Sequence, residues 1–313
     1  MFFKWPLNKL ADYVKVIRND YYVKKQRSRN NMLLRSCFQS VVSTPPLQCN
    51  PSSDVELHAT TSHFHLPMYI TAIKSLLRYY NDITVIVHDD GSFTEEDRHL
   101  VQEHIRGITV IEKTRADAVL KEKMTSFPLC RKFRKNVINA MELFDNILLA
   151  GKEKIVSMNS DVLFLKKPLD VINWIKSESH SIMSVYEEQP AHQKDFLQKW
   201  NCRIPPHITL CLVAFYKKFF DMAFVEDVLS HTGFDWYTAQ NVYPLLFSRA
   251  EDKQPVVFLN TDQYQSSGVF PDNAVFRQYW TSTGFFNEIQ FRDADSVISE
   301  LSTKEVEKYS SGR

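Results

Sequence analysis

The chain has 313 residues, 44% of them hydrophobic, so it can bury a sizeable core in one large domain or two smaller ones. Its 38 Lys and Arg residues are nearly balanced by 37 Asp and Glu residues, which argues against nucleic acid as a partner. Five widely spaced cysteines without a C-x-x-C pair predict neither a zinc site nor a redox motif, and they indicate reduced thiols in the cytoplasm.

The first 35 residues form a basic segment with interleaved aromatic side chains, in which nine Lys or Arg residues face only Asp12 and Asp20. Two interpretations stay open: a helical extension that docks onto the anionic inner face of a membrane, or a solvated helix packed on the main domain. No apolar run approaches the roughly 20 residues that cross a bilayer, and no signal-peptide pattern opens the chain. We therefore expect a cytoplasmic protein.

Residues 43–53 are rich in Pro, Ser and Asn, which predicts a linker. Residues 1–53 are accordingly predicted to be the basic extension and linker, and residues 54–313 the main domain. Strands are predicted at 55–61, 83–88, 108–112 and 154–165, and helices at 66–80, from Thr94 with Asp97 in a capping box, and at 131–149. Strands that alternate with helices predict an α/β fold with a mixed, mainly parallel sheet and helices on both faces.

Polar residues lie at the predicted carboxyl ends of the strands, where open α/β sheets bind ligands. These positions are held by Thr60 and Thr61, Asp89 and Asp90, and residues 159–161. Asp161 interrupts an apolar run, and a carboxylate is costly to bury there unless a cation or hydrogen-bond donors meet it. A Mn²⁺ or Mg²⁺ ion that bridges to a substrate diphosphate would satisfy this requirement, since both ions prefer oxygen ligands.

Several short motifs resemble the nucleotide-sugar half of GT-A glycosyltransferases, over roughly residues 55 to 290. The motifs are His58-Ala59-Thr60-Thr61, Ser75-Leu76-Leu77, Asp89-Asp90-Gly91-Ser92, and Met158 to Phe164 followed by Pro168. The Asp-Asp-Gly-Ser turn is similar to family 2, whereas the strand with Ser-Asp-Val-Leu-Phe is similar to family 8, in which a D-x-D motif holds manganese and the sugar-nucleotide phosphates. The resemblance implies a GT-A fold with a nucleotide-binding half at about 54–168 and an acceptor half at about 169–313.

The resemblance also implies roles for individual residues. The metal ligands would be Asp161, Asn159 and Gln278. The donor would contact Thr60, Thr61, Asp89, Asp90, Ser160, and the helical pair Arg131 and Lys135. The catalytic candidates near the transferred sugar are Asp235 and Gln240. Asn159 departs from the family pattern because it replaces the first Asp of D-x-D, and Gln278 departs because it stands where family 8 has a His ligand.

The predicted reaction is transfer of a hexose-type sugar from a nucleoside-diphosphate-sugar donor to a hydroxyl group of a glycan or lipid, with a divalent cation. Glu187 and Glu188 follow the apolar run 182–186 and are candidates for a general base that activates the acceptor. Two alternatives stay open. A non-catalytic nucleotide- or glycan-binding module could keep the fold, and a nucleotidyltransferase could use a similar sheet, although residues 60–65 hold no glycine for a phosphate loop.

Overall fold

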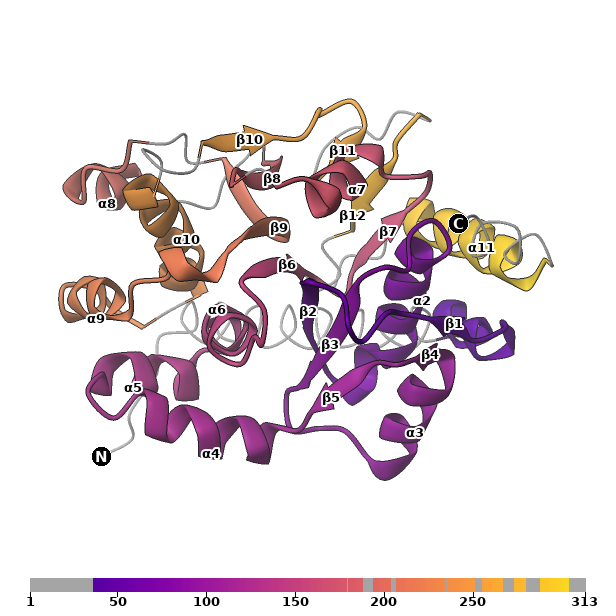
Figure 1. Cartoon of the computed structure of the whole chain (residues 1–313), viewed down its shortest axis with the longest axis horizontal. Coiled ribbons are helices and arrows are strands. Elements are labelled where there is room, and N and C mark those ends of the chain that lie inside the picture. Colours follow the sequence, from indigo (N-terminus) through magenta and orange to yellow (C-terminus); the bar gives the residue numbers. More distant parts are fainter. Residues whose placement is uncertain are drawn as a thin grey trace, which may run out of the picture.

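The computed structural model describes residues 36–178, 180–187, 194–203, 207–234, 236–250, 255–266, 273–279 and 288–303 (Figure 1). The basic segment 1–35 lies outside the described residues. The helices are α2 (Leu66–Leu77), α3 (Glu95–His104), α4 (Lys113–Lys123), α5 (Pro128–Asn136), α6 (Ile138–Leu148), α7 (Leu169–Lys176), α8 (Lys194–Lys199), α9 (Met222–Ser230), α10 (Trp236–Ala250) and α11 (Glu288–Ser302), with short 3-10 turns at Ser40–Ser43, His63–His65 and Lys217–Phe219.

Among the described residues, the main sheet has seven strands in the order β10-β8-β9-β6-β2-β3-β5. Of these seven strands only β9 runs antiparallel to its two neighbours, so the sheet is mixed and mainly parallel, as predicted. These strands are β2 (Val55–Thr61), β3 (Thr84–Asp89), β5 (Thr109–Ile111), β6 (Lys154–Met158), β8 (Ile182–Tyr186), β9 (Ile208–Tyr216) and β10 (Val256–Phe258). Two smaller sheets pair β1 (Leu47–Gln48) with β4 (Ile105–Arg106), and β7 (Val162–Phe164) with β12 (Phe276–Gln278) and β11 (Tyr264–Gln265).

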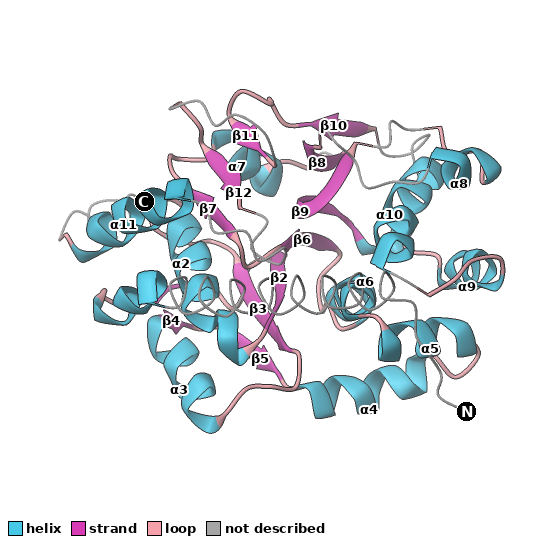
Figure 2. Cartoon of the chain, turned by 180° about the vertical axis from the view of Figure 1, so that it is seen from behind, coloured by secondary structure: helices cyan, strands magenta, loops and turns pink. Residues whose placement is uncertain are grey.

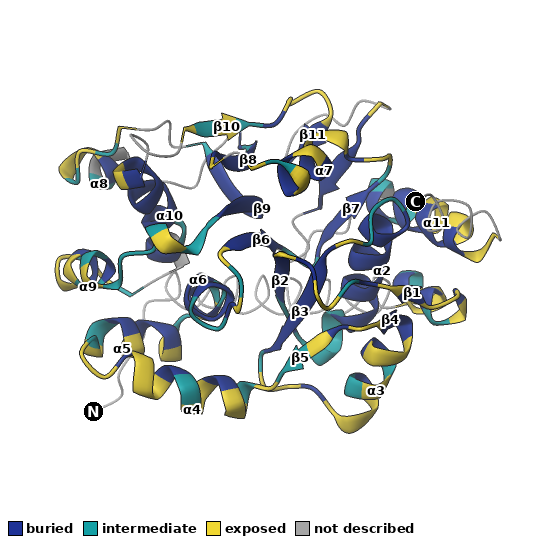
Figure 3. Cartoon of the chain, in the orientation of Figure 1, coloured by how far each residue is buried: buried dark blue, intermediate teal, exposed yellow. Residues whose placement is uncertain are grey.

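Helices cover both faces of the main sheet. Figure 1 shows α5, α6, α9 and α10 on one side and α2, α3 and α11 on the other. Alternate strand residues supply the two cores: Ile155 of β6 packs with the α6 side, whereas Val156 packs with the α2 side. Because both faces are covered, the central strands are buried along almost their whole length (Figure 3).

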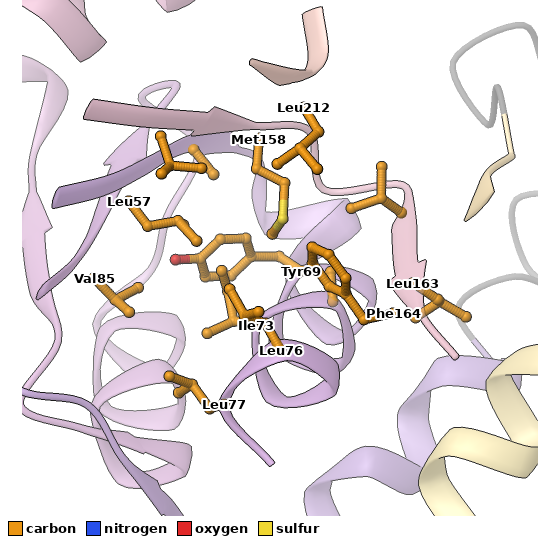
Figure 4. Close-up of a cluster of buried hydrophobic side chains, with 14 of the residues drawn as sticks. Leu57, Tyr69, Ile73, Leu76, Leu77, Val85, Met158, Leu163, Phe164 and Leu212 are labelled. Carbon is orange, nitrogen blue, oxygen red and sulfur yellow. The ribbon is translucent and has the colours of Figure 1, made fainter. Parts of the chain in front are cut away.

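The core on the α2 side is drawn in Figure 4. Tyr69 and Ile73 of α2 lie among Leu57 of β2, Met158 of β6 and Phe164 of β7. Every residue of α2 is buried, so this helix is held between the main sheet and β7 rather than lying on the surface.

The start of α3 confirms the predicted capping box. The Thr94 side chain accepts a hydrogen bond from the Asp97 amide at 3.3 Å, and the Asp97 carboxylate accepts one from the Thr94 amide at 2.8 Å. Replacing Thr94 with alanine should lower the free energy of unfolding by about 1 kcal/mol, measured by urea titration, because one orphan amide of the helix loses its partner. A Thr94→Ser variant keeps the acceptor and should unfold close to wild type; equal losses in both variants would contradict the role of the cap.

Three stretches differ from the sequence-based prediction. Residues 43–53, predicted to be a linker, pack into the core, because Leu47 and Cys49 are buried and β1 pairs with β4. The packed chain therefore begins before Asp54. The helix predicted at 131–149 is two helices, since Val137 is extended between α5 and α6, a conformation that suits its β-branched side chain. The single strand at 154–165 is β6 and β7, which belong to different sheets.

Viewed from behind, β7 and β12 lie beside α2 and α11 (Figure 2). Among the residues that the structure describes, no helix is both long and apolar enough to pass through a bilayer. All five cysteines are free.

Candidate active site

The parallel strands β2, β3 and β6 end along the same edge of the sheet, and their last residues converge there. The amide of Asp90, just after β3, donates to the carbonyl of Thr61 at the end of β2, at 3.2 Å. The amide of Asn159, just after β6, donates to the Cys211 carbonyl of β9 at 3.0 Å. These bonds hold the residues that follow the strands at one edge, which is where ligands bind in open α/β sheets.

A cavity of about 320 Å³ opens at this edge, and we call it the strand-end pocket. Its size lies at the lower end of the roughly 300–1,000 Å³ typical of small-molecule sites. Eight residues predicted from the sequence line it: Thr60, Thr61, Asp90, Asn159, Ser160, Asp161, Gln240 and Gln278. The structure therefore brings together residues that are up to 218 positions apart in the chain, from Thr60 to Gln278.

Three of the predicted donor-binding residues, Asp89, Arg131 and Lys135, do not line the pocket. The Asp89 carboxylate accepts hydrogen bonds from the amides of Gly91 at 2.7 Å and Phe93 at 3.0 Å, so it shapes the turn in which Gly91 has a φ of +101°. Arg131 and Lys135 are exposed on α5 and do not line the pocket, because α5 directs Phe133 and Arg134 inward instead. Asp235 lies outside the described residues.

Asp161 and Gln278 become neighbours through the small sheet. β12 runs antiparallel to β7 with Gln278 opposite Val162, and the Tyr279 amide donates to the Asp161 carbonyl at 3.0 Å. Asp161 is 8% exposed and Gln278 is 8% exposed. The change of sheet after Met158 thus turns Asp161 toward the pocket wall formed by the C-terminal part of the chain.

Several polar atoms of the pocket are buried without a hydrogen-bond partner among the described residues. They are the amide oxygen of Gln278 and the hydroxyls of Thr60 and Thr61. A buried polar atom without a partner costs about 1–3 kcal/mol, so such groups call for an explanation when several share one cavity. A polar ligand in the strand-end pocket would supply the missing partners.

The charged side chains that line the pocket are all acidic or histidine. Carboxylates come from Asp90, Glu142, Asp161 and Glu187, and the lining residues that the structure describes include no Lys or Arg. An anionic ligand such as a diphosphate would be repelled by these carboxylates unless a cation accompanied it. The pocket is therefore suited to a ligand that brings or shares a positive ion.

Glu142 is the residue that sequence reasoning missed. It lies on α6 among the buried residues Met141, Leu143 and Phe144, and it lines the pocket beside the strand ends. An acidic residue inside an apolar helical run was the available signal. Glu187, predicted as a candidate base, is buried and also lines the pocket, while Glu188 lies outside the described residues.

Burial, together with the negative charge of Asp161, raises the pKa of Glu142 from 4.5 to about 7. Because the pKa is raised in the folded state, ionisation of Glu142 lowers the free energy of unfolding. This loss is absent below pH 4.5 and complete above about pH 7. Glu142→Gln should therefore raise the free energy of unfolding at pH 8 by about 3 kcal/mol in the presence of chelator, and by much less at pH 5. Urea titration at the two pH values checks this; a gain that does not depend on pH would contradict it.

The donor set of the pocket fits a hard divalent cation. Carboxylate and amide oxygens are suitable ligands for Mg²⁺ or Mn²⁺, and Asp161, Asn159 and Gln278 offer one carboxylate and two amides on neighbouring segments. Within the described ranges there is no group of three His, Cys, Asp or Glu side chains arranged to hold a metal ion. A cation here would consequently depend on amide oxygens and on the ligand as well as on carboxylates.

By sequence, the chain matches no protein-family model and no curated protein. By structure it is similar to the galactosyltransferase LgtC solved with donor and acceptor sugar analogs, with a TM-score of 0.52 and 15% identity over 81% of this chain and 99% of that one. It is also similar to the bifunctional glycosyltransferase WbbM, with a TM-score of 0.51 and 12% identity. The match covers 83% of this chain and 51% of the WbbM chain. The chain therefore has the GT-A-type fold of these glycosyltransferases.

Proposed function

We propose that the protein is a glycosyltransferase that moves a hexose-type sugar from a nucleoside-diphosphate sugar to a hydroxyl group of a glycan or lipid. One observation carries the proposal: the strand-end pocket of a GT-A-type fold gathers Asp90, Asp161 and Gln278 with buried hydroxyls that lack partners among the described residues. A sugar nucleotide is rich in hydroxyl and phosphate oxygens that match these groups. The LgtC structure, whose fold is similar, contains donor and acceptor sugar analogs.

In this proposal the donor lies across the ends of β2, β3 and β6. Thr60, Thr61 and Ser160 would hydrogen-bond to the donor, Asp90 would contact its nucleoside, and Asp161 with Asn159 and Gln278 would hold a divalent cation. The cation, when bound, would neutralise charge that develops on the departing diphosphate. We propose about 54–168 as the donor-binding half of the domain and about 169–313 as the acceptor-binding half.

The acceptor side would be formed by β8, β9 and α10. Gln240 lies in the second turn of α10 and faces the pocket, so its amide can hydrogen-bond to the sugar being transferred. Glu187 follows β8, where its carboxylate can accept a proton from the attacking hydroxyl. Asp235 remains a candidate of the same kind from the sequence.

The experiment that tests the proposal mixes the purified full chain with a panel of UDP- and GDP-sugars, with Mn²⁺ or with chelator, and measures the nucleoside diphosphate that is released. Release from one donor that depends on metal is expected, and that donor identifies the sugar. If no donor is cleaved and no nucleotide changes the melting temperature, the proposal fails.

A second candidate is a binding module without catalysis, which the neutral Asn159 favours because the segment 159–161 carries a single carboxylate. In that case, nucleotide should bind without being cleaved. The Asn159→Asp variant separates the two functions: a gain of turnover in the variant alone would support the binding module, whereas turnover by the wild type excludes it.

A further inference from the structure

The segment after β6 carries one carboxylate, Asp161, and a neutral amide, Asn159. A second carboxylate reaches the same pocket from a different element, because Glu142 of α6 also lines the cavity. Glu142 and Asp161 thus enter one cavity from two different elements.

One hydrogen bond fixes α6 against β6. The Asn146 side chain donates to the Ser157 hydroxyl at 2.8 Å, and both side chains are buried. Glu142 lies one helical turn before Asn146, on the same face of α6. A short connection joins the end of α6 at Leu148 to the start of β6 at Lys154.

The bond between Asn146 and Ser157 brings Glu142 near the segment 159–161. One turn back along α6 from Asn146 covers about 5.4 Å and reaches Glu142. Two residues forward along the chain from Ser157 cover about 6.6 Å and reach Asn159. Glu142, Asn159 and Asp161 all line the strand-end pocket, so the two carboxylates share one cavity.

An independent observation indicates that this wall meets a ligand. Gln278 and Thr61 are more than nine-tenths buried and line the pocket, yet the Gln278 amide oxygen and the Thr61 hydroxyl have no hydrogen-bond partner among the described residues. An amide oxygen that accepts no hydrogen bond is a competent ligand for a hard cation. No Lys or Arg of the described lining offsets the two carboxylates.

We propose that Glu142 and Asp161 bind the divalent cation together, so that Glu142 supplies from α6 the carboxylate that Asn159 does not. The inference rests on the proposed function for the role of the cation, but the binding itself is independent of turnover. Asn159 and Gln278 add amide oxygens, which gives an all-oxygen site of the kind that Mn²⁺ and Mg²⁺ accept.

The test measures Mn²⁺ binding to the full chain in the absence of nucleotide. Isothermal titration calorimetry and the loss of the electron paramagnetic resonance signal of free Mn²⁺ are the two readouts. Glu142→Gln should weaken Mn²⁺ binding by about 10-fold or more. The double variant Glu142→Gln with Asn159→Asp moves the carboxylate to the other side of the site and should recover most of the affinity. Glu122→Gln, an exposed position on α4, is the matched control and should bind as wild type does.

Wild-type affinity in Glu142→Gln overturns the inference, and so does a double variant that stays as weak as Glu142→Gln. Loss of binding is interpreted only with a folded protein, judged by its circular dichroism and melting temperature. If Glu142→Gln did not fold, Glu142→Asp replaces it: the shorter carboxylate should weaken Mn²⁺ binding, and unchanged affinity overturns the inference. Binding that depends on Glu142 without cleavage of any donor would refute the proposed function and leave the cation pair standing.

Discussion

Replacing Asp161 with asparagine should slow the release of nucleoside diphosphate from the preferred donor by at least about 100-fold. The effect on kcat should be larger than the effect on KM. The neutral amide keeps the shape of the side chain but removes the carboxylate that lines the pocket next to Gln278. The charge of the departing diphosphate would then lack the cation held at its side of the pocket. Initial rates at saturating donor, with Mn²⁺ in excess, measure the effect.

The matched control is Asp227→Asn on α9, which removes an exposed carboxylate outside the pocket and should leave kcat unchanged. The Asp161→Asn protein should also melt within a few degrees of wild type, so that lost activity is separated from lost folding. A variant that is folded and retains wild-type kcat would remove Asp161 from the reaction and would leave the metal-holding role without support.

Replacing Arg134 with methionine should lower the free energy of unfolding by about 3–5 kcal/mol. The Arg134 guanidinium donates to both carboxylate oxygens of Asp145, at 2.6 and 2.7 Å, and to Asp117 at 2.6 Å. Asp145 is fully buried, so loss of the arginine would leave its charge without a counterion. Urea titration at pH 7.5 measures the change.

Two further variants separate this explanation from a loss of packing. Arg134→Met combined with Asp145→Leu removes both charges and should recover most of the stability, because a buried pair costs little to replace with apolar groups. Arg98→Met breaks the pair with Glu95, whose carboxylate is largely exposed, and should cost no more than about 1 kcal/mol. If the double variant were as unstable as Arg134→Met, the buried charge of Asp145 would not be the cause.

The order of strands and helices could be predicted because each core strand carries a dense apolar run. The strand predicted at 55–61 matches β2, and the run at 182–186 matches β8. The run at 154–165 could not be divided in advance, because apolar residues reveal that a strand is buried but not which strand it pairs with. Both β6 and β7 are buried, but β6 pairs with β2 and β9 whereas β7 pairs with β12. This difference in pairing places Asp161 at the turn between two sheets.

The same limit applies to side chains on helices. Arg131 and Lys135 share one face of α5, but their spacing carries no information about whether that face meets the pocket or water, and the structure leaves both exposed. Glu142 is the opposite case. Its place inside an apolar run marks it as unusual, but only the bond between Asn146 and Ser157 shows that this face of α6 meets the strand ends. Gln278 could be identified only through the family resemblance, since nothing near it in the chain marks a ligand.

The pairing of β7 with β12 makes the pocket a product of the whole chain. A protein that ended after Pro168 would keep Asp161 and Asn159 but lose Gln278, and the edge of β7 would lose the strand that covers it. It would also lose the contact of α11 with α2, where Arg78 pairs with Glu300 at 2.8 Å. The halves proposed to bind donor and acceptor are therefore not modules that could be exchanged between proteins. A chimera joined near Pro168 would need β12 and α11 from the same protein that supplies its N-terminal half.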